Sequence, residues 1–82
     1  MTRADLILLD LDEHPWSTTA QVAERIGAPV RTVRTIVTHL YQRGELRRHP
    51  LPPQPRRGAP GHLFALAMNE EAAPSAAERG AA

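Results

Sequence analysis

The chain contains no cysteine and no lysine, and its 82 residues include a single Trp, a single Tyr and a single Phe. The absence of cysteine excludes a disulfide framework and a thiolate metal site. No apolar run approaches the roughly 20 residues that a membrane-spanning helix needs. The short apolar run at residues 6–9 is flanked by aspartates, which argues against a secretory signal peptide. We therefore expect a soluble, cytoplasmic protein of one small domain with a modest hydrophobic core.

The net charge of +1 conceals an uneven distribution of charge along the chain. Residues 1–30 carry a charge of −3, residues 31–57 a charge of +6, and residues 58–82 a charge of −2. Every basic residue is Arg, which forms paired hydrogen bonds with phosphate and guanine better than Lys does. The base composition of the genome could explain the preference for Arg over Lys, but it does not explain the clustering. Such a confined positive segment is typical of a nucleic-acid-binding surface.

Two short amphipathic helices are predicted within residues 18–46, on either side of the Gly-Ala-Pro sequence at 27–29. Apolar side chains recur at helical spacing on both; they are Ala20, Val22, Ala23 and Ile26 on the first, and Val33, Ile36, Val37 and Leu40 on the second. The opposite face of the second helix carries Arg31, Arg34, Thr35 and Thr38 at positions i, i+3, i+4 and i+7. A helix with an apolar back and an Arg/Thr front, supported by a short helix before it, is the layout of a helix-turn-helix.

Residues 18–46 resemble the winged-helix branch of helix-turn-helix proteins, which includes many small bacterial and phage regulators. The residues that match the usual spacing of this family are Thr18, Ala23, Ile26, Gly27, Thr32, Val33, Leu40, Gly44 and Leu46. The resemblance covers about residues 2–68; it is specific for the fold, but not for any subfamily. It implies a mainly α domain with a small β-hairpin over residues 1–68, in the order helix, short strand, helix, helix, strand, wing, strand. The composition of residues 69–82 predicts a disordered or frayed tail.

Local signals bound the predicted elements. The pairs that fit capping boxes at helix starts are Thr2 with Asp5 and Thr18 with Gln21. Gly27 fits the left-handed residue that follows a helix, and Pro29 fits the start of the next helix, predicted over residues 29–43. In this family the segment at 16–18 often forms a short strand with a single bridge, and Trp16 is expected to anchor the core at the base of the wing. Residues 46–49 and 62–67 are the two candidate strands of the hairpin.

The hairpin loop at residues 50–61 is rich in Pro and Gly and carries Arg56 and Arg57 at its tip. It is either a basic wing that contacts phosphates or the minor groove, or a solvated loop, and the flanking strand patterns favour the wing. The resemblance implies sequence-specific binding of double-stranded DNA by a transcriptional regulator, with the helix at 29–43 in the major groove. The residues expected to face base edges are Val30, Arg31, Arg34, Thr35 and Thr38. Those expected to contact phosphates or the minor groove are Thr18, Thr32, Arg47, Arg48, Arg56 and Arg57.

The first predicted helix is apolar on nearly every side. Its inward stripe consists of Ala4, Ile7, Leu8 and Leu11. Leu6 and Leu9 lie off this stripe, so the helix is either the central helix of the domain or one side of it forms a homodimer interface.

Other chemistries have little support in the sequence. The four histidines lack the spacing of a metal site, so we expect no metal and no cofactor. Asp10, Asp12 and Glu13 could imitate a catalytic carboxylate cluster, but we interpret them as a solvated surface and expect no enzyme. Two other functions remain open. The fold could dock on an acidic protein partner, or it could bind left-handed duplexes. The second is discounted, because Arg34 and Thr38 stand where the related family carries Asn and Tyr.

Overall fold

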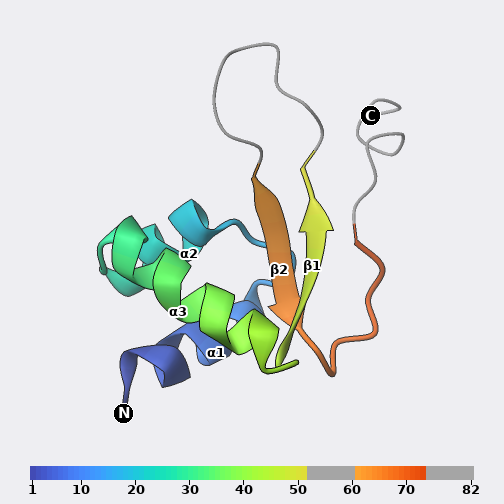
Figure 1. Cartoon of the computed structure of the whole chain (residues 1–82), viewed down its shortest axis with the longest axis horizontal. Helices are drawn as coiled ribbons and strands as arrows, with labels where there is room; N and C mark the ends of the chain where they lie inside the picture. Colours follow the sequence, from blue (N-terminus) through green and yellow to red (C-terminus); the bar gives the residue numbers. More distant parts are fainter. Residues whose placement is uncertain (52–60, 74–82) are drawn as a thin grey trace.

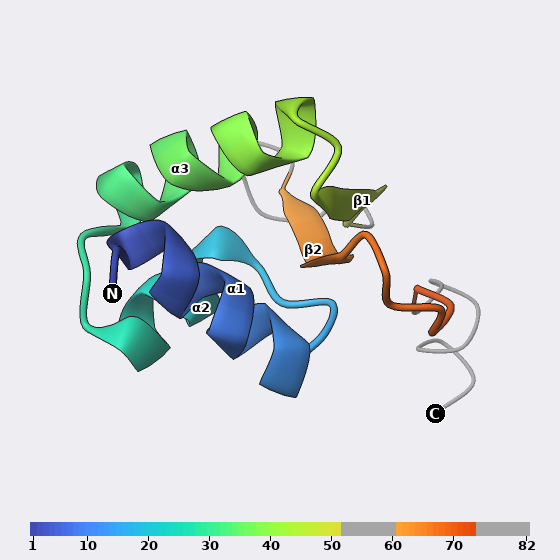
Figure 2. The same ribbon diagram turned by 90° about the horizontal axis from the view of Figure 1, so that it is seen from below.

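The computed structural model describes residues 1–51 and 61–73. Three helices are followed by a two-stranded antiparallel hairpin, and the helices lie together beside it (Figures 1 and 2). The elements are α1 (Arg3–Glu13), α2 (Thr19–Ile26), α3 (Val30–Gln42), β1 (Leu46–Pro50) and β2 (His62–Leu66). β2 is the strand nearer the helices, and its register pairs Leu46 with Leu66 at one end and Pro50 with His62 at the other.

The predicted element order needs one correction, because the segment at 16–18 is not a strand of its own. Ser17 forms a single antiparallel bridge with Phe64, in which each backbone N–H donates to the other residue's carbonyl. Trp16 immediately before it has a left-handed φ of 61°, a conformation that costs a non-glycine residue about 1–2 kcal/mol. The turn at Trp16 and the start of α2 after Thr18 bound the extended segment on its two sides, so only the Ser17 bridge forms beside β2.

Both predicted capping boxes are present. The Oγ1 atom of Thr2 accepts a hydrogen bond from the Asp5 N–H at 3.1 Å, and the Asp5 carboxylate accepts one from the Thr2 N–H at 3.0 Å. Hydrogen bonding of this carboxylate to Thr2, chiefly to the Thr2 backbone N–H, lowers the pKa of Asp5 from its ordinary value of 3.8. Thr18 and Gln21 form the same pair of bonds at the start of α2. The short-range hydrogen bonds that the sequence predicts therefore define the first turns of α1 and α2.

The turn between α2 and α3 also has the predicted geometry. Gly27 is the C-cap of α2 and has a φ of 72°, a left-handed conformation that glycine adopts without strain. Pro29 is the N-cap of α3, one position outside the predicted helix start, so its missing N–H leaves no helical hydrogen bond unformed.

The main core lies between the three helices and the inner face of the hairpin. Its fully buried side chains are Ile7, Leu11, Val22, Val33 and Val37, and Leu46 and Phe64 of the hairpin close it. The outer face of the hairpin carries a second cluster, made of Trp16, Leu63 and Ala65. Because β2 is buried on both faces, its apolar residues do not alternate with polar ones, which is why the strand pattern in the sequence is weak. Trp16 is buried as predicted, but it packs in this second cluster on the outer face of the hairpin and not in the main core.

Residues 69–73, which follow β2 after a short turn, include the contacts of the C-terminal segment with the second cluster. Asn69 and Glu71 accept hydrogen bonds from the Arg47 side chain through their backbone carbonyls, and Glu71 also accepts one from the Trp16 indole. Ala73 packs against the same cluster. The part of the predicted tail that the structure describes is therefore attached to the domain, while residues 74–82 lie outside the described residues.

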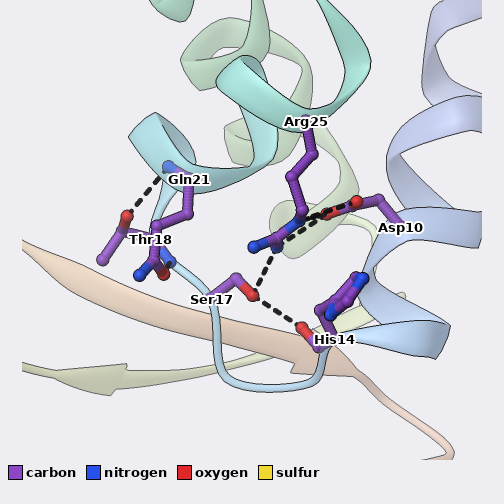
Figure 3. Close-up of polar contacts among 6 residues, drawn as sticks. All are labelled: Asp10, His14, Ser17, Thr18, Gln21 and Arg25. Carbon is purple, nitrogen blue, oxygen red and sulfur yellow. Dashed lines mark hydrogen bonds and ion pairs between the residues drawn. The ribbon is translucent and has the colours of Figure 1, made fainter.

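The prediction of a solvated acidic surface at the end of the first helix is wrong for Asp10. Asp12 and Glu13 are exposed, but Asp10 is only 8% exposed and forms a bidentate ion pair with Arg25 of α2. The guanidinium of Arg25 also donates to the Ser17 hydroxyl at 2.7 Å, and this hydroxyl donates to the His14 carbonyl (Figure 3). One polar network thus joins α1, α2 and the bridge segment, and it neutralises a carboxylate that would otherwise face the negative end of the α1 dipole.

Candidate nucleic-acid interface

The predicted base-facing side of α3 is exposed. Arg31, Arg34, Thr35 and Thr38 all lie in solvent, and Val30 at the start of the helix is 38% exposed. The opposite side of the helix buries Val33, Val37 and Leu40 in the core. The hydroxyls of Thr35 and Thr38 donate to the carbonyls four residues earlier, at 3.1 and 2.9 Å. Their oxygens can still accept hydrogen bonds, because a hydroxyl has two lone pairs.

A hollow of about 460 Å³ lies between α3 and the hairpin. The residues that line it are Thr19, Arg34, Thr38, Arg48, Gly61, His62 and Phe64. The described residues that line it thus include two guanidinium groups and no carboxylate. The hollow is therefore an electropositive concavity beside the exposed face of α3.

Arg48 is held at the edge of this hollow by an aromatic ring of the helix. Its guanidinium carbon lies 4.2 Å from the centroid of the Tyr41 ring, within the range of a cation–π contact. Such stacking restricts a long side chain without using its hydrogen-bond donors. Within the described residues neither Arg34 nor Arg48 forms an ion pair, so both guanidinium groups can bind an anion.

Arg47, predicted together with Arg48 as a phosphate contact, lies on the other face of the hairpin. Its guanidinium donates to the carbonyls of Asn69 and Glu71 at 2.6 and 3.0 Å, and it lies 4.9 Å from the Trp16 ring centroid. The side chains of adjacent residues in a strand point to opposite faces. The two arginines therefore occupy separate sites, and Arg47 is engaged with the C-terminal segment.

The remaining residues predicted to contact DNA differ in how freely their side chains can reach it. The hydroxyl of Thr18 accepts the capping bond of α2, and Thr32 is half-buried. Arg56 and Arg57 lie outside the described residues. On α1, Leu6 and Leu9 are 39% and 51% exposed, and their role in a homodimer stays a prediction.

Five residues that the sequence did not suggest as site residues line the hollow or support it. Thr19, Gly61, His62 and Phe64 line it, and Tyr41 supports Arg48 from α3. No local pattern identifies Thr19 or His62, because they reach the hollow only through the packing of α2 and the hairpin against α3. Tyr41 lies seven residues after Arg34, a spacing that places both on one side of the helix.

Within residues 1–51 and 61–73, no three His, Asp or Glu side chains are grouped so that they could hold a metal ion. In the same part of the chain, no helix combines the length and the apolar character needed to cross a membrane.

The fold is shared with two solved structures. The transcriptional regulator PcaV from Streptomyces coelicolor, determined in complex with its natural ligand, has a TM-score of 0.67 and is 26% identical over 80% of this chain and 44% of its own. Stf76 from the Sulfolobus islandicus plasmid-virus pSSVx has a TM-score of 0.68 and is 21% identical over 85% of this chain and 87% of its own. The chain thus spans less than half the length of PcaV. No family model and no curated protein matches the sequence.

These similarities confirm the resemblance predicted from residues 18–46. Three helices followed by an antiparallel hairpin form a winged helix, so the chain has a winged-helix fold like that of the transcriptional regulator PcaV.

Proposed function

We propose that this chain binds double-stranded DNA in a sequence-specific manner and regulates transcription. In this proposal α3 enters the major groove with its exposed Arg/Thr face, and the hairpin follows the backbone. The observation that carries the proposal is the joint position of Arg31, Arg34 and Arg48, which are exposed on or beside a helix whose opposite side is fixed in the core. A rigid helix that presents arginine and threonine is suited to the hydrogen-bonding edges of base pairs.

The charge distribution supports the same function. The described residues of the segment 31–57 include Arg31, Arg34, Arg43 and Arg48 as exposed cations. Arg43 is paired with Glu45, so the unneutralised charge is concentrated on α3 and the adjacent hollow. DNA affinity depends on such contacts, because each neutralised phosphate releases bound counterions.

The proposal does not include Arg47 among the DNA contacts. Its guanidinium is bound to backbone carbonyls of residues 69 and 71, on the face of the hairpin that carries the Trp16 cluster. A DNA contact would require these two hydrogen bonds to break, and together they contribute about 1–2 kcal/mol because the Arg47 side chain is only partly buried.

The first test is direct binding of the whole chain to duplexes of random sequence at several salt concentrations. We expect the logarithm of the affinity to fall linearly with the logarithm of the salt concentration, with a slope of about −0.9 for each phosphate contacted. Selection from a random duplex library should then give a consensus. Binding of an acidic protein with no salt-dependent binding to any duplex would instead assign the chain to protein–protein interaction.

A further inference from the structure

The five residues predicted to face the bases do not occupy equivalent positions around α3. Arg34 and Thr38 line the hollow between α3 and the hairpin, whereas Val30, Arg31 and Thr35 do not. Val30 and Arg31 lie in the first turn of α3, about one turn before Arg34, and Thr35 is about 100° around the helix from Arg34. Arg34, Thr38 and Tyr41 follow one another at i, i+4 and i+7 and share the side from which the Tyr41 ring contacts Arg48. Val30, Arg31 and Thr35 therefore lie outside the hollow.

We infer that the hollow seats the sugar-phosphate backbone of one DNA strand, and that Arg34 contacts a phosphate there rather than a base edge. This inference rests on the proposed function. It separates the residues proposed to contact DNA into those that bind phosphate and those that read bases. Arg34 and Arg48 position the duplex, and sequence is read by Val30, Arg31 and Thr35, which lie outside the hollow.

The charge of the hollow selects a phosphate over a base. Two guanidinium groups line one concavity whose described lining residues include no carboxylate. An anion placed between them is attracted by both, whereas the edge of a base pair has no net charge with which to balance them. Additional donors at the hollow are the hydroxyl of Thr19 and the ring of His62, whereas the hydroxyl of Thr38 already donates to the Arg34 carbonyl.

The hollow is partly preorganised for a phosphate, because Arg48 is held in place by Tyr41. Its guanidinium is stacked on Tyr41, so less side-chain freedom is lost when a phosphate binds. Arg34 comes from α3 itself, whose other side is anchored by Val33 and Val37 in the core. Both arginines therefore approach the hollow from rigid elements, one from the helix and one from the hairpin.

The experiment compares Arg34→Gln, Arg34→Lys and Arg31→Gln with the wild-type chain. Each variant is assayed on a random-sequence duplex over a series of sodium chloride concentrations, and each is used to select a consensus from a random duplex library. Arg43→Gln is the matched control, since it removes the same charge from an exposed arginine that is paired with Glu45 outside the hollow. All these side chains are exposed, so the variants should fold, which circular dichroism would verify.

We expect Arg34→Gln to weaken binding to the consensus duplex and to the random duplex by the same factor, and to reduce the salt slope by about one unit. Arg34→Lys should recover the slope and leave the consensus unchanged, because Lys binds phosphate as a point charge but cannot replace a bidentate contact to guanine. Arg31→Gln should instead lower the ratio of consensus to random affinity. Arg43→Gln should retain the wild-type slope.

The inference would be overturned if Arg34→Gln altered one position of the consensus and Arg34→Lys failed to restore it, with the salt slope unchanged. Arg34 would then read a base, and the proposed function would stand. The alternative ligand of the hollow is free inorganic phosphate instead of the phosphate of a DNA backbone. If inorganic phosphate shifted the NMR signal of the Arg34 side chain while Arg34→Gln left duplex binding unaffected, the hollow would be a small-anion site and the inference would be wrong. Absence of salt-dependent duplex binding by the wild-type chain would overturn the inference and the proposed function together.

Discussion

Arg47 and Arg48 are neighbours in β1, but each guanidinium lies on its own aromatic ring on opposite faces of the hairpin. Arg47 is 4.9 Å from the ring centroid of Trp16, and Arg48 is 4.2 Å from that of Tyr41. The pleat of the strand separates two residues that the sequence presents as one basic pair. One of them holds the C-terminal segment against the hairpin, while the other borders the proposed DNA surface.

Exchanging these two arginines for alanine should therefore have opposite consequences. Arg47→Ala loses two hydrogen bonds to backbone carbonyls and should destabilise the fold by about 1–2 kcal/mol, with little effect on the salt slope of DNA binding. Arg48→Ala loses only an exposed cation–π contact and should cost less than about 1 kcal/mol of stability, but it should reduce the slope by about one unit. Thermal unfolding and salt-series binding measure the two effects. Equal salt slopes for the two variants would contradict the separation of their roles.

The Asp10–Arg25 pair should contribute more to stability than the neighbouring exposed carboxylates. We expect Asp10→Ala to lower the free energy of unfolding by about 2 kcal/mol, because it leaves the guanidinium of Arg25 without its carboxylate partner. The loss should stay below the 3–5 kcal/mol of a fully buried pair, since the Arg25 side chain is 31% exposed and its charge is partly screened by water. Denaturant unfolding measures the difference.

Asp12→Ala is the matched control for this change, because Asp12 is exposed on the same helix. It should change stability by no more than about 0.5 kcal/mol. If both variants unfolded at the same denaturant concentration, the network around Arg25 would have no net stabilising role.

The capping box of α1 should make stability depend on pH in the acid range. The pKa of Asp5 is lower in the folded chain than its ordinary value of 3.8. Its contribution is therefore complete above about pH 4 and is lost as the pH falls through the folded pKa. Asp5→Asn removes this titration, so the decrease in melting temperature between pH 7 and pH 3 should be smaller in the variant than in the wild-type chain. Equal decreases would show that the Thr2–Asp5 bonds do not persist in solution.

The exposed leucines of α1 test the predicted homodimer. Leu6 and Leu9 lie three residues apart on one side of the helix and keep 39% and 51% of their surface exposed. If they form an isologous interface, the wild-type chain should sediment as a dimer and the double variant Leu6→Ser, Leu9→Ser as a monomer of unchanged helicity. A wild-type chain that is monomeric at every concentration tested would rule out this interface.

Local interactions explain why much of the fold could be predicted. The Thr2 and Thr18 caps, the left-handed Gly27 and the apolar stripes of the helices depend on residues at most four positions apart, and the structure has all of them. The strands were placed to within about one residue for the same reason, because Gly44 ends the turn before β1 and a Pro/Gly-rich segment separates β1 from β2.

Only the tertiary structure decided which polar residues meet. Asp10 and Arg25 are 15 positions apart and pair because α1 packs on α2. Arg34 and Arg48 line one hollow because α3 and the hairpin are fixed against a common core. The face of Arg47 could not be predicted, because β2 is apolar toward both sides and its sequence does not show which side meets the helices. Hydrogen bonds and helical periodicity act over a few residues and can be recognised in a sequence, whereas contacts between elements depend on how the whole core packs.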